Sequence, residues 1–130
     1  MAAPGASDDV VGLVRAFMDA FVSAWPSQDA AALAPFFAPH ATYHNVPLDP
    51  AVGRAAIVDE FARFMQLGGE VGVELLHVAA EGPVVLTERV DHFTNGTSKV
   101  DLPVMGVVEV HDGLITAWRD YFDLGQAVPA

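Results

Sequence analysis

Residues 70–124 read EVGVELLHVAAEGPVVLTERVDHFTNGTSKVDLPVMGVVEVHDGLITAWRDYFDL. This segment is rich in Val, Thr, Phe and Trp, which favour β-strands. It is interrupted by Glu81-Gly82-Pro83, Asn95-Gly96 and Asp112-Gly113. Asn-Gly and Asp-Gly are preferred dipeptides of tight hairpin turns. The pattern therefore predicts a four-stranded antiparallel meander.

The residues before this segment show helical periodicity. Apolar residues recur at three- and four-residue steps over 10–25, and Ser7 fits the N-cap of a helix there. A second, shorter helix is expected over 27–37, a short strand over 41–46 and a third helix over 54–67. This order predicts an α+β fold with a strongly curved, mixed or antiparallel sheet. The N-terminal helices should pack on that sheet and leave a deep apolar pocket beneath them.

The composition indicates one folded domain over residues 1–130. A hydrophobic fraction of 52%, against 18% charged residues, provides enough apolar surface to offset the conformational entropy lost on folding. Residues 1–6 and 126–130 are expected to form flexible tails.

Charge and cysteine content exclude several classes of function. Six Lys and Arg residues against 17 Asp and Glu residues give a formal charge of -11, so nucleic acids and anionic membranes would be repelled. The chain has no cysteine, which excludes disulfides, thiol nucleophiles and thiolate metal sites. The N-terminus does not resemble a signal peptide, and no apolar run is long enough to span a bilayer. These features favour a cytoplasmic location.

Three ionisable residues are candidates for chemistry. Side chains alternate between the two faces of a strand, so Arg89 and Asp91 share the face of Val85 and Phe93. In the last strand, Asp120 lies between two aromatic residues of the same face. If these faces line the pocket, the two carboxyl groups must pair with the guanidinium, because unpaired buried charges are costly. The alternative is an ordinary salt bridge on a solvent-facing sheet.

A second candidate pair lies in the short strand. Tyr43 and Asn45 share one side of that strand, where a phenol and an amide could position a water molecule together. Near a proline-rich turn, the same two residues could instead serve as a core side chain and a turn side chain.

Together, these motifs give the chain a resemblance to the limonene-1,2-epoxide hydrolase family. The matching segments occur in the family's order, over nearly the whole chain; they are Tyr43-x-Asn45-x-Pro47, Glu88-Arg89-Val90-Asp91 and Trp118-Arg119-Asp120-Tyr121-Phe122-Asp123. The resemblance implies the cone-shaped α+β barrel of the nuclear-transport-factor-2-like fold, usually dimeric. It also implies hydrolysis of a small apolar epoxide to a vicinal diol, without a cofactor.

The resemblance further implies a role for each matching residue. Asp120 would take a proton from water, and Tyr43 and Asn45 would hold that water. Asp91 would act as the acid, and Arg89 would bridge the two carboxyl groups. Two carboxyl groups that share one guanidinium should titrate as a coupled pair, so we expect Asp91 protonated and Asp120 ionised.

Several large apolar residues are candidates for the pocket wall, although such residues are more often plain core. The set comprises Phe64, Met65, Phe93, Trp118 and Phe122, together with Phe17, Met18, Phe21, Phe61 and Met105. No metal site is expected. The histidines are spread over different elements, and His40 and His44 do not share a helical face because Pro39 precedes a predicted strand.

Two other functions remain open on the sequence alone. One is a polyketide cyclase or ketosteroid-isomerase-like enzyme of the same fold, in which a single carboxylate removes a carbon-bound proton. That chemistry gives no reason for the full set of five polar residues. The other is a noncatalytic protein that binds an apolar ligand, because a fold alone does not establish a function.

Overall fold

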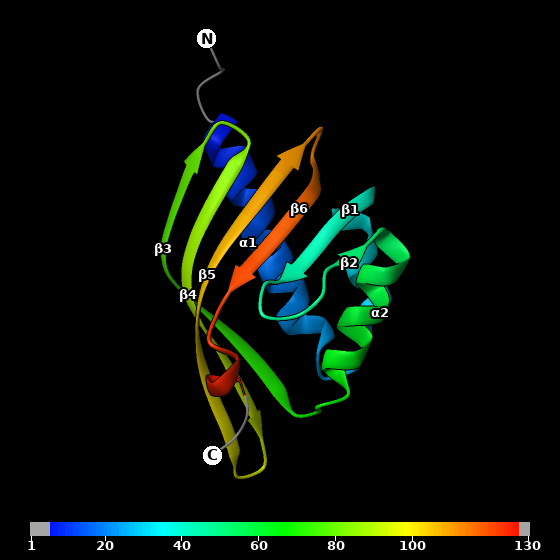
Figure 1. Ribbon diagram of the computed structural model, residues 1–130, viewed down its shortest axis with the longest axis vertical. Helices are drawn as coiled ribbons and strands as arrows, with labels where there is room; N and C mark the ends of the chain where they lie inside the picture. Colours follow the sequence, from blue (N-terminus) through cyan, green and yellow to red (C-terminus); the bar gives the residue numbers. More distant parts are fainter. Residues whose placement is uncertain (1–5, 128–130) are drawn as a thin grey trace.

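In the computed structural model, which describes residues 6–127, helices pack on one face of a curved six-stranded sheet (Figure 1). The helical elements are α1 (Ala6–Ala24), the 3-10 helix η1 (Ala30–Phe36), α2 (Arg54–Met65) and the short 3-10 helix η2 (Leu124–Gln126). The strands are β1 (Phe37–Asn45), β2 (Ala51–Val52), β3 (Glu70–Glu81), β4 (Val84–Asn95), β5 (Ser98–His111) and β6 (Leu114–Tyr121).

The predicted meander is confirmed. Strands β3 to β6 pair in sequence order, each antiparallel to the next. Gly96 and Gly113 adopt positive φ angles of 62° and 75° in the two tight turns. Residues other than glycine rarely adopt this backbone conformation. The turn residues and the strand residues therefore specify the same register.

The sheet is curved but does not close into a barrel. Its strand order is β2-β1-β6-β5-β4-β3, so β2 and β3 are two separate edges. Strand β1 lies parallel to β6, which makes the sheet mixed. Helix α1 packs across β3 and β4, and α2 packs across β1 and β2. The expectation of a barrel is therefore corrected to an open, curved sheet covered by two helices.

The first and third predicted helices are present, with small differences at their ends. Helix α1 begins at Ala6, so Ser7 lies within its first turn and not at the N-cap. Helix α2 ends at Met65, two residues before the predicted end. The second predicted helix is shorter and is a 3-10 helix, because Pro35 lacks an amide hydrogen and interrupts α-helical hydrogen bonding.

Strand β1 is longer than predicted. It begins at Phe37, and its pairing with β6 shifts register between Phe37 and Thr42. The carbonyl oxygen of Phe37 accepts hydrogen bonds from Arg54 Nε at 3.0 Å and Nη2 at 2.6 Å. The start of α2 is therefore tied to the start of β1. The two-residue strand β2 was not predicted, because it lies in a proline-rich stretch.

The core that supports the sheet is dominated by aromatic rings. Phe17 of α1 lies at its centre, with its ring centroid 5.5 Å from that of Phe37 and 4.8 Å from that of Trp118. Trp25 ends this helical stripe and donates a hydrogen bond from Nε1 to the carbonyl of Gly68 at 2.9 Å. Helix α1 is thereby fixed at both the middle and the end against the sheet and the loop after α2.

The expected tails are partly ordered structure. Ala6 belongs to α1, Gln126 belongs to η2, and Ala127 lines the cavity described below. The remaining tail residues, 1–5 and 128–130, lie outside the described residues. Among residues 6–127, no helix combines the length and the apolar character needed to cross a membrane.

Candidate active site

A cavity of about 380 Å³ lies between the helices and the sheet. Its wall includes four of the five principal candidates from the sequence, namely Phe64, Phe93, Trp118 and Phe122. The fifth, Met65, was predicted wrongly: it is fully buried in the core and does not line the cavity. Neighbouring residues of a helix point about 100° apart, so when Phe64 faces the cavity, Met65 faces the core.

The remaining wall candidates divide in the same way. Phe17, Met18 and Phe21 of α1 line the cavity, as predicted. Phe61 is fully buried in the core, and Met105 lies half-exposed on the opposite face of the sheet. The predictions for Phe61 and Met105 are therefore corrected. The hydrophobicity of a side chain does not reveal whether it faces a cavity, the core or an outer surface.

All five polar candidates line this cavity. Tyr43 and Asn45 lie on β1, directly opposite Trp118 and Asp120 of β6 in the parallel pairing. Arg89 and Asp91 come from β4. The strand alternation that placed these residues on shared faces is confirmed, because every one of them points into the cavity.

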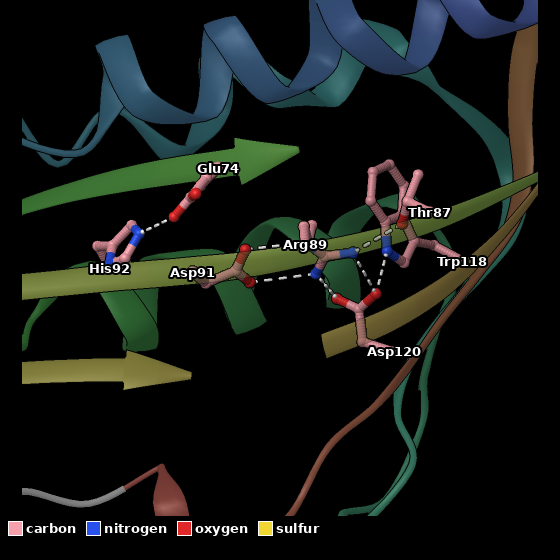
Figure 2. Close-up of polar contacts among 7 residues, drawn as sticks. All are labelled: Glu74, Thr87, Arg89, Asp91, His92, Trp118 and Asp120. Carbon is pink, nitrogen blue, oxygen red and sulfur yellow. Dashed lines mark hydrogen bonds and ion pairs between the residues drawn. The ribbon is translucent and has the colours of Figure 1, made fainter. Parts of the chain in front are cut away.

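Arg89 bridges the two carboxyl groups, each through two hydrogen bonds (Figure 2). One edge of its guanidinium donates to Asp91, from Nε to Oδ1 at 2.9 Å and from Nη2 to Oδ2 at 3.1 Å. The other edge donates to Asp120, from Nη1 to Oδ1 at 3.0 Å and from Nη2 to Oδ2 at 2.6 Å. The side chains of Arg89 and Asp120 are each 5% exposed, so the site has the buried arrangement and not the solvent-facing salt bridge.

Two further residues hold this network and were not assigned that role from the sequence. Trp118 donates a hydrogen bond from Nε1 to Asp120 Oδ1 at 2.8 Å. The buried hydroxyl of Thr87 accepts a bond from Arg89 Nη1 at 3.3 Å. Each lies two residues before a member of the triad on the same strand. Strand alternation puts Thr87 on the face of Arg89 and Trp118 on the face of Asp120, and this was the signal available in the sequence.

The environment sets the protonation of two groups. Burial raises the pKa of Asp91 above its usual value, and this effect outweighs the lowering caused by the guanidinium of Arg89. Burial, reinforced by the negative charge of Asp120, raises the pKa of Tyr43 well above 10. The phenol of Tyr43 is therefore neutral, and Asp91 is the carboxyl group of the triad whose raised pKa favours retaining a proton.

Burial opposes the charge of Arg89, but the carboxyl groups of Asp120 and Asp91 more than compensate, so its pKa is raised overall. The guanidinium is permanently charged at any pH that the protein would meet. It can therefore hold two carboxyl groups in fixed positions while only their own protons are exchanged.

His92 follows Asp91 in sequence but points to the other face of β4, as predicted from strand alternation. It pairs with Glu74 at 2.9 Å, as Figure 2 shows, and with Asp101 at 2.6 Å. It does not line the cavity. Within residues 6–127, no three His, Cys, Asp or Glu side chains form a group suited to a metal ion.

The raised pKa of Asp91 predicts how stability depends on pH. The folded chain retains a proton at Asp91 that the unfolded chain releases at about pH 4. The protonated Asp91 therefore contributes to the free energy of unfolding. This contribution is complete below about pH 4 and is lost as the pH rises through the pKa of Asp91 in the folded state. We expect the difference in unfolding free energy, wild type minus Asp91→Asn, to decrease with rising pH.

Urea unfolding of both proteins at a series of pH values measures this difference. Asp19→Asn, at an exposed position of α1, is the control and should leave the pH dependence unchanged. A wild type that gains stability relative to Asp91→Asn as the pH rises would contradict the assignment.

Comparison with known proteins places this geometry in a family. The family model described as limonene-1,2-epoxide hydrolase catalytic domain matches residues 9–129. The chain belongs to this family. Epoxide hydrolase EphG of Mycobacterium tuberculosis is 36% identical over 109 residues, which are 82% of this chain and 71% of that protein. Membership of the limonene-1,2-epoxide hydrolase family and this relative support epoxide hydrolysis as the general reaction.

Solved structures of similar proteins share the fold of this chain. The structure of an epoxide hydrolase from M. tuberculosis, described as similar to limonene-1,2-epoxide hydrolase, has a TM-score of 0.74 and 32% identity. The match covers 92% of this chain and 86% of the M. tuberculosis chain. SalBIII, described as an epoxide hydrolase/cyclase-like enzyme with a role in pyran ring formation, has a TM-score of 0.69 and 22% identity. That match covers 86% of this chain and 92% of SalBIII, and at this identity it supports the shared fold alone.

Proposed function

We propose that this protein adds water to a small, mostly apolar epoxide in one step and releases a vicinal diol, without a cofactor. The observation that carries the proposal is the pair of carboxyl groups held on one guanidinium in the wall of a mostly apolar cavity. Epoxide opening needs a base for the attacking water and an acid for the departing oxygen, acting together. Asp120 and Asp91 supply these two groups.

The hydrogen bonds of Asp120 favour one of its two oxygens as the base. A carboxylate has about four lone-pair sites, two on each oxygen. Oδ1 already accepts bonds from Arg89 Nη1 and Trp118 Nε1, whereas Oδ2 accepts one bond, from Arg89 Nη2. We therefore assign Oδ2 as the atom that accepts the proton of the attacking water.

In the reaction, the water oxygen forms a bond to one epoxide carbon while its proton passes to Asp120. The bond between that carbon and the epoxide oxygen breaks, and Asp91 donates its proton to the departing oxygen. Asp120 then holds a proton and Asp91 is ionised, so one proton must return to Asp91 before the next turnover. Because one proton enters the triad as another leaves it, the total charge does not change, and Arg89 always faces one ionised carboxylate.

Tyr43 and Asn45 are proposed to hold the attacking water next to Asp120. The neutral phenol of Tyr43 can both donate and accept a hydrogen bond. Its ring is fixed against Phe61, with ring centroids 4.8 Å apart. Asn45 is paired directly with Asp120 across β1 and β6, so its amide lies beside the base. Three groups from two adjacent strands are thus available to hold one water molecule.

The two alternatives make less use of the site. A polyketide cyclase or ketosteroid-isomerase-like enzyme needs one base and a donor for an oxyanion, and leaves the second carboxyl group on Arg89 without a task. A noncatalytic protein has no need of a buried ionic network that costs desolvation free energy in the wall of a mostly apolar cavity.

Incubation with limonene 1,2-epoxide and cyclohexene oxide, followed by gas chromatography with mass detection, tests the proposal. The expected result is a vicinal diol from at least one of the two epoxides. Tight binding of an epoxide that is not consumed would favour the binding protein. Conversion of a ketosteroid or polyketide substrate, without any diol from these or bulkier epoxides, would favour the other enzyme class.

We also propose that the protein is a homodimer. The sheet face opposite the cavity exposes Leu76, Leu86, Met105 and Tyr121, each between 45% and 49% accessible. A second chain would remove these apolar side chains from water. Light scattering is expected to give twice the chain mass of 13.8 kDa, and the mass of a single chain at micromolar concentration would contradict the proposal.

A further inference from the structure

Gly106 of β5 lies between the two strands that carry the triad. It is paired with Thr87 of β4 on one side and with Asp120 of β6 on the other. Arg89 must therefore reach across β5 to bind Asp120, and Gly106 is the residue beneath that crossing.

The other buried β5 residues on this face have branched side chains. Leu102, Val104, Val108 and Val110 are all buried there, at the alternate positions that include Gly106. Gly106 interrupts this row, although glycine in a strand interior is unfavourable relative to alanine. The backbone does not require the exception, because Gly106 is not among the glycines with positive φ. The reason must be space.

The contacts of a hypothetical methyl group identify what needs that space. A Cβ atom at position 106 would lie 2.6 Å from Arg89 Nη1, 2.7 Å from Thr87 Oγ1 and 2.9 Å from Asp120 Oδ1. All three atoms belong to the buried hydrogen-bond network. The guanidinium cannot move aside easily, because both of its edges are bonded to carboxyl groups.

We propose that Gly106 is a positioning residue for the reaction: the absence of a side chain leaves room for Arg89 to cross β5 and hold Asp120. The effect of Gly106 on catalysis rests on the proposed function. Its effect on the hydrogen-bond network of Arg89 and Asp120 rests on the contacts at position 106 alone. Any side chain at this position would separate Arg89 from Asp120 or displace both, and would leave the general base misaligned with the attacking water.

Gly106→Ala tests the proposal, with Gly72→Ala as the matched control. Gly72 lies in β3, and a Cβ atom there would meet nothing closer than His92 Cβ at 3.9 Å. Gly106→Ala is expected to lower kcat for cyclohexene oxide or limonene 1,2-epoxide by at least about 100-fold, because displacement of a catalytic group by about 1 Å has effects of this size. KM is expected to change far less. Gly72→Ala should retain the activity of the wild type.

The two tryptophans supply a readout that is independent of activity. Trp118 Nε1–H is bonded to Asp120, inside the network, and Trp25 Nε1–H is bonded to Gly68, away from it. In ¹H–¹⁵N spectra, Gly106→Ala is expected to shift the indole resonance of Trp118 and leave that of Trp25 in place. If wild type forms no diol from these or bulkier epoxides, the proposed function fails, and this spectrum still tests whether Gly106 leaves the room that the hydrogen-bond network needs.

A compensating variant separates a local clash at position 106 from unfolding of the protein. Thr87→Ala removes the hydroxyl that would lie 2.7 Å from the new methyl group and gives the guanidinium room to move. Thr87→Ala combined with Gly106→Ala is therefore expected to fold and to be at least about tenfold more active than Gly106→Ala alone, because the effects of substitutions at two residues in contact are not additive. Near wild-type activity and an unmoved Trp118 resonance in Gly106→Ala would overturn the proposal, as would a double variant no better than the single one.

Discussion

Asp120→Asn is expected to lower kcat for diol formation by about 10³-fold, the size of effect produced by loss of a general base. The asparagine side chain has almost the same shape, but its amide does not accept a proton from water. Oδ2, which we assign as the base, would become either an amide nitrogen or a much weaker acceptor oxygen. Measurement of kcat and KM with the epoxide that wild type converts best gives the result.

The control for this variant is Asp59→Asn, at an exposed position of α2. It changes the net charge equally and should leave kcat unaltered. Circular dichroism should give the same spectrum for both variants as for wild type. If Asp120→Asn retained a kcat within tenfold of wild type, Asp120 would not be the base.

Arg89→Lys is expected to lower kcat by about 100-fold or more while the protein remains folded. Lysine keeps the positive charge, but its single ammonium group cannot occupy both edges that now hold Asp91 and Asp120. One carboxyl group would lose its fixed position, and the distance between acid and base would no longer match the epoxide. Kinetics together with urea unfolding separate this effect from a loss of stability.

Arg119→Lys is the matched control for the bridging role. Arg119 lies on β6, one residue before Asp120, and donates a hydrogen bond to Glu109 on the face opposite the cavity. We expect this variant to keep the kcat of wild type. Near wild-type turnover by Arg89→Lys would refute a requirement for two carboxyl groups on one guanidinium.

Much of the site followed from the alternation of side chains along strands. A period of two residues placed Arg89 with Asp91 on β4, and the same period placed Asp120 with Trp118 on β6. The turn dipeptides at Asn95 and Asp112 then set the register that brings those strands together. Local geometry was sufficient here because each step involves neighbours in the sequence or across a hairpin.

Features that depend on packing between distant segments could not be derived in this way. The parallel pairing of β1 with β6 joins residues far apart in the chain, and the open edge at β2 depends on where α2 packs. Phe64 and Met65 are adjacent and similarly apolar, yet only Phe64 reaches the cavity. The rotation of α2 about its axis, relative to the sheet, decides which of the two side chains faces the cavity.

Gly106 illustrates a signal that is visible in the sequence but readable only with the structure. A glycine within a strand rich in valine marks a bulge or a close approach of another group. Which group approaches depends on the long Arg89 side chain and its partners on a different strand. The sequence identifies the position as unusual, and the contacts explain it.

We propose that water attacks the epoxide directly, with Asp120 as its base. A single turnover in oxygen-18 water, with wild-type enzyme in excess over the epoxide, distinguishes this direct attack from attack by a protein carboxylate. Direct attack predicts that the first diol formed carries one oxygen-18 atom and that the protein carboxyl groups remain unlabelled. An unlabelled first diol, with oxygen-18 incorporated into an aspartate, would instead demonstrate a covalent ester intermediate and contradict the mechanism.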